Sequence, residues 1–201
     1  MRNEENLKDL VLLKPDFIGF IFYKKSKRWI EHPVQISYPN KTKKVGVFVN
    51  EAIDELLAKI QQFELDFIQL HGDETPAYCK KLKQIELLRK NGVELIKAFS
   101  VDKDFNFDKV EAFAPHCNLF LFDTKGEDYG GTGRKFDWSV LKSYKGSTPF
   151  LLSGGISLGD VEEIRSMKHS SFVGVDINSG FEKAPAMKNI EMIKEFKNKL
   201  I

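Results

Sequence analysis

Short runs of β-branched and aromatic residues alternate along the chain with segments whose apolar residues recur at helical spacing. These runs begin about 22 to 31 residues apart, the spacing of successive strand–helix units. The pattern therefore predicts one α/β domain over residues 1–201, built around a parallel sheet. The seven predicted strands are Phe17 to Tyr23, Val45 to Asn50, Phe67 to His71, Glu94 to Phe99, Leu119 to Thr124, Phe150 to Ser153 and Phe172 to Ile177.

The intervening segments carry helix-capping signals. Asn3 precedes a helix ahead of the first strand, and Thr75-Pro76 supplies an N-cap followed by a first-turn proline. Asn50 and Ser157 are further candidate caps. The proline-containing segment 34–40 leaves room for two helical turns at most, and eight helical segments would accompany the seven strands.

Strands that are apolar on both sides imply a sheet covered on both faces or closed on itself. The even spacing favours a (β/α)8 TIM barrel, whose usual size begins near about 200 residues. Because a helix precedes the first predicted strand, the sequence predicts this barrel with strand one missing from the chain as given. An open sheet is the alternative.

Composition excludes several classes of protein. A net charge of +2 argues against nucleic-acid binding, and no apolar run approaches the roughly 20 residues that span a membrane. Cys79 and Cys117 form no disulfide framework, which favours a cytoplasmic location. The four histidines lack metal-ligand spacing, so we expect no dedicated metal site.

Polar residues and glycines follow the predicted strands at their C-terminal ends, where parallel barrels build their active sites. Ser153-Gly154-Gly155 and Asn178-Ser179-Gly180 end the last two βα units, where exposed backbone N–H groups can bind a phosphate. Alternatively, these glycines only turn the chain. The glycine-rich segment 125–135, which contains Gly131, is either a lid over a ligand or an ordinary surface loop.

Three side chains at this face are candidates for chemistry. Asp123 follows an apolar strand, a setting that favours a general acid, although a capping or ion-paired aspartate would look the same. Arg28 could bind a substrate carboxylate or belong to a solvated basic loop. His71 is either a substrate-pocket residue or a structural hydrogen-bonding residue.

Six segments, in order and spanning nearly the whole chain, resemble the phosphoribosylanthranilate isomerase family. They are Gly19 to Tyr23 with Ser26-Lys-Arg28, Val45 to Asn50, Gln69-Leu-His-Gly72, Phe122-Asp-Thr124 with Tyr129-Gly-Gly131 and Phe136-Asp-Trp138, Leu152-Ser-Gly-Gly155, and Val175-Asp176 with Ser179-Gly180. The resemblance implies a cofactor-free (β/α)8 barrel of tryptophan biosynthesis. Its reaction is the Amadori rearrangement of N-(5-phosphoribosyl)anthranilate, an aminoaldose, to an aminoketose.

The resemblance also implies residue roles. Asp123 would be the general acid that opens the ribose ring, Arg28 would hold the anthranilate carboxylate, and His71 would lie in the substrate pocket. The phosphate would be held by the loops that follow the last two strands. The substrate-binding set is then completed by Gly131, Gly154, Gly155, Asp176, Asn178, Ser179 and Gly180.

The chain departs from the family pattern at one point. The family's general base is a cysteine that ends the first strand, whereas Met1-Arg2 aligns with residues just after that cysteine. Either translation starts upstream or the chain is truncated, and as given we expect impaired catalysis. The alternatives are a non-catalytic phosphosugar-binding barrel or another phosphosugar enzyme, as a monomer or a homodimer.

Overall fold

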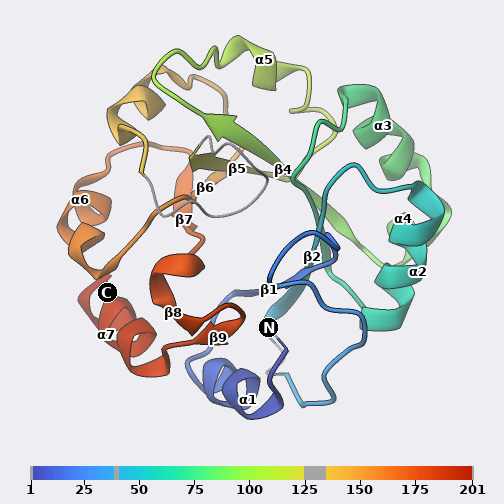
Figure 1. The fold of residues 1–201 in the computed structure, drawn as a ribbon. Coiled ribbons are helices and arrows are strands. Elements are labelled where there is room, and N and C mark those ends of the chain that lie inside the picture. The colour runs from blue at the N-terminus through green and yellow to red at the C-terminus, as the bar shows by residue number, and fades with distance from the viewer. Residues whose placement is uncertain (1, 39–40, 125–134, 201) are drawn as a thin grey trace.

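The computed structural model describes residues 2–38, 41–124 and 135–200. Within these ranges, seven parallel strands pair in chain order, and the sheet curls with the helices around its outside (Figure 1). All seven predicted strands are confirmed, and six begin at the predicted residue. They are β1 Phe17–Ile21, β2 Lys43–Phe48, β3 Phe67–Leu70, β4 Glu94–Val101, β5 Leu119–Thr124, β6 Phe150–Leu152 and β7 Phe172–Val175.

Helices connect the strands. The α-helices are α1 Glu4–Leu12, α2 Ile53–Phe63, α3 Pro76–Gln84, α4 Glu86–Lys90, α5 Asp108–Glu111, α6 Val161–Ser166 and α7 Ile190–Leu200. The described ranges also contain three short 3-10 helices, η1 Trp138–Ser143, η2 Leu158–Asp160 and η3 Ser179–Phe181. A small antiparallel pair, β8 Glu182–Ala184 and β9 Met187–Lys188, follows η3. Among the described helices, none has the length and hydropathy of a membrane-crossing segment.

The prediction of eight helices is wrong in its details. Residues 34–38, the described part of the predicted segment 34–40, contain no helix. The physical reason is the short space between Pro33 and Pro39, because a proline disfavours helical geometry in the residue before it, here Tyr38, and too few residues remain for a stable helix. Between β5 and β6 the described residues contain the 3-10 helix η1 instead of an α-helix.

Three of the four predicted helix caps are confirmed. The side chains of Asn3 and Thr75 each accept a hydrogen bond from the backbone N–H three residues later, and Ser157 forms a capping box with Asp160, whose carboxylate accepts a bond from the Ser157 N–H at 2.7 Å. The prediction for Asn50 is wrong, because α2 begins three residues further along and its own N-cap position makes no side-chain bond. Asn50 instead adopts a left-handed conformation with φ of 52° and accepts a hydrogen bond from the Asp73 N–H at 2.7 Å.

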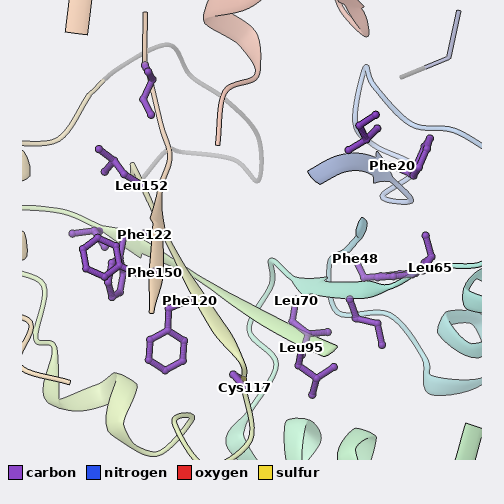
Figure 2. Close-up of a cluster of buried hydrophobic side chains, with 14 of the residues drawn as sticks. Phe20, Phe48, Leu65, Leu70, Leu95, Cys117, Phe120, Phe122, Phe150 and Leu152 are labelled. Atoms are coloured by element: carbon purple, nitrogen blue, oxygen red, sulfur yellow. The ribbon is translucent and has the colours of Figure 1, made fainter. Parts of the chain in front are cut away.

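Strand β5 shows how both faces of the sheet are buried. Leu119 and Leu121 belong to a cluster made only of strand residues, whereas Phe120 and Phe122 belong to a larger cluster that includes helix residues such as Leu56. Since the helices lie outside the curl, the first cluster fills its inner face (Figure 1). The larger cluster, part of which is shown in Figure 2, fills the space between sheet and helices.

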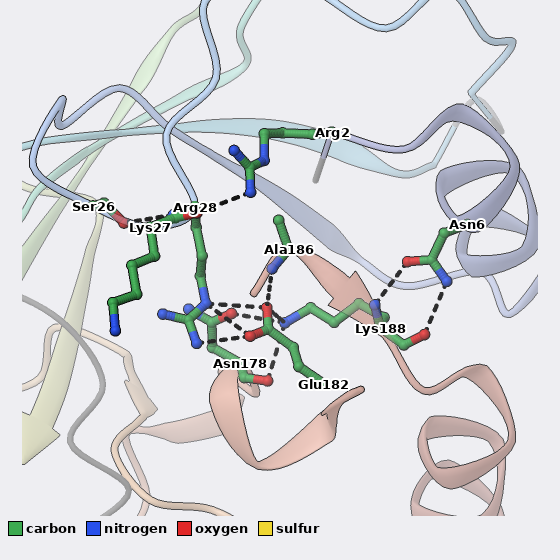
Figure 3. A network of polar contacts seen from close by, with 9 residues as sticks. All are labelled: Arg2, Asn6, Ser26, Lys27, Arg28, Asn178, Glu182, Ala186 and Lys188. Atoms are coloured by element: carbon green, nitrogen blue, oxygen red, sulfur yellow. Dashed lines mark hydrogen bonds and ion pairs between the residues drawn. The ribbon is translucent and has the colours of Figure 1, made fainter. Parts of the chain in front are cut away.

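Residues far apart in the sequence are joined through Asn6 on α1. Its side-chain oxygen accepts a hydrogen bond from the Lys188 N–H at 2.7 Å, and its amide donates to the Lys188 carbonyl at 2.9 Å (Figure 3). Asn6 is 8 % exposed, so both bonds are shielded from water. The Asn6 side chain therefore pairs both the N–H and the carbonyl of Lys188, as the backbone of a neighbouring strand would.

Replacing this side chain tests the link. Asn6→Ala leaves the N–H and the carbonyl of Lys188 without their partner, and we expect the free energy of unfolding in urea to fall by about 2 kcal/mol. Asn198→Ala, at an exposed position on α7, is the matched control and should change it by less than about 0.5 kcal/mol. Equal effects of the two substitutions would contradict the importance of the link.

Candidate active site

The two-residue period of the strands determines which polar side chains lie inside the curl. Asp123 continues the inner face of β5 after Leu121, and His71 continues the inner face of β3 after Phe67. Ser153 extends β6 in the same way, with its N–H donating to the β5 backbone. All three therefore lie at the C-terminal end of the sheet, where the inner apolar cluster ends.

Asp123 and His71 contact each other directly. His71 Nε2 lies 3.2 Å from Asp123 Oδ2, and the Gln69 amide nitrogen lies 2.8 Å from His71 Nδ1. With the Gln69 amide donating to Nδ1, the ring proton is on Nε2 and is donated to the carboxylate. Asp123 Oδ1 accepts a hydrogen bond from the Thr124 N–H at 2.9 Å.

This arrangement holds the carboxyl group of Asp123 in one orientation. The side chains of Asp123 and His71 are 17 % and 18 % exposed, so both are shielded but can be reached from the mouth of the curl. A carboxyl group held this way can exchange a proton with a ligand bound above it.

Asp176, just after β7, is the second carboxyl group on the inner face. It accepts a hydrogen bond from Ser153 Oγ at 3.1 Å. Desolvation, and then the negative charge of Asp123, raises the pKa of Asp176 above its ordinary value of 3.8. The positive charge of Lys188, the Ser153 bond and His71 oppose this rise. Two carboxyl groups and one histidine thus share this end of the sheet.

The loop after β6 approaches Asp123 closely because it contains glycines. Gly154 and Gly155 have φ values of +91° and +66°, a region that side chains disfavour. A Cβ atom at Gly154 would lie 2.5 Å from the Thr124 nitrogen and 2.7 Å from Asp123 Oδ1. Only glycine lets the backbone pass this close to the carboxyl group.

The loop that follows β7 lies against the loop after β6. A Cβ atom at Gly180 would overlap the carbonyl oxygen of Ile156. Ser179 and Gly180 are the first two residues of η3, directly after Asn178. The structure thus brings the two predicted phosphate-binding loops together, and their glycines are needed for the close approach.

Arg28 contacts an acidic residue that the sequence analysis did not consider. Its Nε lies 2.8 Å and its outer nitrogen 2.7 Å from Glu182 Oε2, which makes a two-point contact (Figure 3). Glu182 is the first residue of β8, directly after η3. The Arg28 guanidinium therefore lies beside the second predicted phosphate-binding loop.

The sequence pattern also did not predict the buried pair of Lys97 and Glu74. Lys97 is only 3 % exposed. Its Nζ donates hydrogen bonds to the carbonyls of Leu70 and Gly72 and lies 3.1 Å from Glu74 Oε2. The ion pair between Lys97 and Glu74 could have been expected from the sequence, because a lysine inside the apolar run of β4 needs a buried partner. For Glu182 the sequence offered no comparable signal. Gly131, predicted as a substrate-binding residue, lies outside the described residues.

Among the residues that the structure describes, no three histidine, cysteine, aspartate or glutamate side chains gather in a way that could hold a metal ion. The expectation of a metal-free and cofactor-free reaction stays a prediction.

Fold and site together define an α/β enzyme whose polar centre lies at the C-terminal end of a curled parallel sheet. Residues 1–199 match the family model of N-(5'-phosphoribosyl)anthranilate (PRA) isomerase, and the chain belongs to this family of isomerases.

Two curated relatives carry the family name. The Parabacteroides distasonis protein is 44 % identical, with 98 % of this chain and 88 % of the relative covered. The Phocaeicola vulgatus protein is 40 % identical, with 100 % and 94 % covered. The extent of these matches agrees with that of the family model.

Two crystal structures of phosphoribosyl anthranilate isomerase share the fold. The Thermotoga maritima enzyme has a TM-score of 0.81 and 29 % identity, with 100 % of this chain and 95 % of that chain covered. The Thermus thermophilus enzyme has a TM-score of 0.83 and 22 % identity, with 100 % and 94 % covered.

The close approach of Gly154 to Asp123 can be tested by adding one methyl group. Gly154→Ala forces a side chain into a positive-φ position and against the Asp123 carboxyl group, so we expect the free energy of unfolding to fall by about 3 kcal/mol. Gly92→Ala is the matched control, because Gly92 has φ of +64° and open space around it. The control should lose about 1 kcal/mol. Similar losses in both variants would show that the methyl group meets no obstacle at Gly154.

The raised pKa of Asp176 predicts a pH effect on stability. Between pH 3.8 and its raised folded-state pKa, the unfolded chain has released the proton that the folded chain still binds, so wild-type stability falls as pH rises. Asp176→Asn removes this titration. We therefore expect its free energy of unfolding, relative to wild type, to increase as the pH rises from about 4 through the raised pKa of Asp176. The exposed Asp9→Asn variant is the reference, and a decreasing difference for Asp176→Asn would contradict the prediction.

Proposed function

We propose that this chain converts N-(5'-phosphoribosyl)anthranilate to its 1-deoxyribulose 5-phosphate derivative, the Amadori rearrangement of tryptophan biosynthesis. The single observation that carries the proposal is the Asp123 carboxyl group, held by His71 and Thr124 at the mouth of the curled sheet beside Gly154.

A solved relative supports the proposed class of substrate. A phosphoribosyl anthranilate isomerase, 28 % identical and with a TM-score of 0.75, was crystallised with reduced 1-(o-carboxyphenylamino)-1-deoxyribulose 5-phosphate, and the match covers 98 % of this chain and 93 % of that chain. In this chain, the backbone of Gly154, Gly155, Ser179 and Gly180 would hold the phosphate. Arg28 would bind the carboxylate of the aromatic ring, while His71, Asp176, Asn178 and Gly131 complete the substrate site.

The chemistry needs one acid and one base. Asp123 donates a proton to the ribose ring oxygen, the C1–O bond breaks, and the nitrogen lone pair forms the Schiff base. His71 and the Thr124 N–H stabilise the carboxylate that remains. A base then removes the C2 proton, and the resulting enolamine tautomerises to the aminoketone. The family resemblance implies that this base is a cysteine, which residues 1–201 do not include at the matching position. We therefore expect residues 1–201 alone to be a slow catalyst.

Several finer statements belong to the same proposal. The seven strands would be part of a (β/α)8 TIM barrel with strand one missing, no cofactor would take part, and the protein would act in the cytoplasm. It would be a monomer or a homodimer. A monomer form of the dimeric Thermotoga maritima enzyme has 26 % identity, a TM-score of 0.77 and coverage of 98 % of this chain and 93 % of that chain.

The reaction is tested by following the fluorescence of phosphoribosylanthranilate. We expect its loss with a polypeptide extended through the codons upstream of Met1, at a rate about 10²- to 10⁴-fold above that of residues 1–201 alone. An inert extended chain would overturn the proposal. Binding of the reduced product analogue without turnover would instead favour a non-catalytic phosphosugar-binding protein.

The role of Asp123 is tested in the extended chain. Asp123→Asn removes the ionisable proton but keeps the size of the side chain, so we expect turnover to fall about 10²- to 10⁴-fold while the analogue still binds through its phosphate. Asp137→Asn, an exposed aspartate at the start of η1, is the control and should retain turnover. Near-normal turnover of Asp123→Asn would refute the acid role.

A further inference from the structure

A buried group of charged and polar side chains joins the loop after β1 to the β8–β9 hairpin. We define the Glu182 network as Arg28, Asn178, Glu182 and Lys188 (Figure 3). The Glu182 side chain is 4 % exposed and accepts hydrogen bonds from Arg28, from the Ala186 N–H at 3.2 Å and from Lys188 Nζ at 3.2 Å. A carboxylate has about four acceptor sites, and here they are nearly all in use.

The Glu182 carboxylate is ionised in this surrounding. Burial alone would raise its pKa, but the hydrogen bond from Arg28 and the charges of Lys188 and Arg28 lower the pKa below its usual range. Lys188 is itself held by Asn178, whose side-chain oxygen accepts a bond from Nζ at 2.7 Å. The hydrogen bonds of the network therefore hold the Glu182 carboxylate in place, and Glu182 in turn holds the Arg28 guanidinium.

The contact leaves one edge of the guanidinium open. An arginine has five N–H donors in a planar fork, and Glu182 takes those on the edge formed by Nε and one outer nitrogen. Within residues 2–38, 41–124 and 135–200, no second acidic partner takes the opposite edge. The Arg28 side chain is 16 % exposed, so it is not fully enclosed by the protein.

The backbone on the Arg28 side is also anchored. Trp29 makes a parallel bridge to Ile21, and the Ile30 N–H donates to the Ile21 carbonyl at 3.0 Å. The loop after β1 therefore returns to the edge of the sheet directly after Arg28. With the backbone held on one side and Glu182 on the other, the direction of the side chain is determined.

We propose that Glu182 is a positioning residue that orients Arg28 so that its open edge faces the carboxylate of the substrate's aromatic ring. The inference rests on the proposed function, because it takes Arg28 as the carboxylate-binding group. Since Glu182 follows η3 directly, it also sets the distance between the carboxylate-binding and phosphate-binding parts of the site.

The test compares two ligands by titration calorimetry. One is the reduced product analogue, and the other is its phenylamino counterpart without the carboxylate. We expect Glu182→Gln to weaken binding of the first about 10-fold or more, the size typical of losing a partner that orients a binding group. Binding of the second should change by less than about twofold, whereas a general structural defect would weaken both ligands equally.

The direction of the effect separates positioning from charge. Glu182→Gln removes a negative charge beside Arg28, so electrostatics alone would tighten binding of a carboxylate. Positioning predicts weaker binding. The matched control is Glu64→Gln, because Glu64 is also ion-paired, with Lys44 at 2.9 Å, but is 85 % exposed.

A double-mutant cycle tests whether Glu182 acts through Arg28. In an Arg28→Met background, adding Glu182→Gln should change the affinity for the carboxylate analogue by less than about twofold. If Glu182→Gln does not fold, Glu182→Asp, which keeps the charge on a shorter side chain, must show the same selective loss.

The outcomes distinguish the two proposals. If wild-type protein binds both ligands equally, Arg28 does not bind the carboxylate, and the assigned role of Arg28 fails together with this inference. If wild-type protein prefers the carboxylate ligand and Glu182→Gln keeps that preference, the positioning role alone is overturned.

Discussion

Because a parallel sheet is buried on both faces, the polar side chains of its site lie beyond the apolar core, at the C-terminal ends of the strands. Every second residue of each strand faces the inside of the curl, where apolar side chains fill the space along most of its length. Asp123 is the next inner position after Leu121 on β5, and His71 follows Phe67 and the polar Gln69 on the inner face of β3, a strand that is not a neighbour of β5. Their contact at 3.2 Å thus depends on the curvature of the sheet as well as on strand register.

The loops at this end are stabilised differently from the strands. Strands are held by regular backbone pairing, whereas the loops after β1 and β7 are joined by buried charges around Glu182. Breaking a buried ion pair leaves an uncompensated charge, so such a contact gives a loop a defined geometry. The same contact lies between the two parts of the site proposed to bind the opposite ends of the substrate.

The fold was predictable because its signals are local. Apolar runs of strand length and the capping side chains of Asn3, Thr75 and Ser157 act within a few residues, and the structure confirms both. Asn50 shows the limit of this reasoning. A residue that looks like a helix cap instead bonds to Asp73, more than twenty residues away, because the ends of β2 and β3 meet there.

The sequence by itself determined the order and type of the strands, the inward direction of Asp123 and His71, and the glycine positions of the two loops. These follow from the two-residue period and from backbone freedom, which are properties of short segments. Only the tertiary structure decided the partners: Gln69 for His71, Asn6 for the backbone of Lys188, and Glu182 for Arg28. The last two pairs join residues more than 150 positions apart, and nothing in a local pattern encodes which distant side chain the folded chain brings alongside.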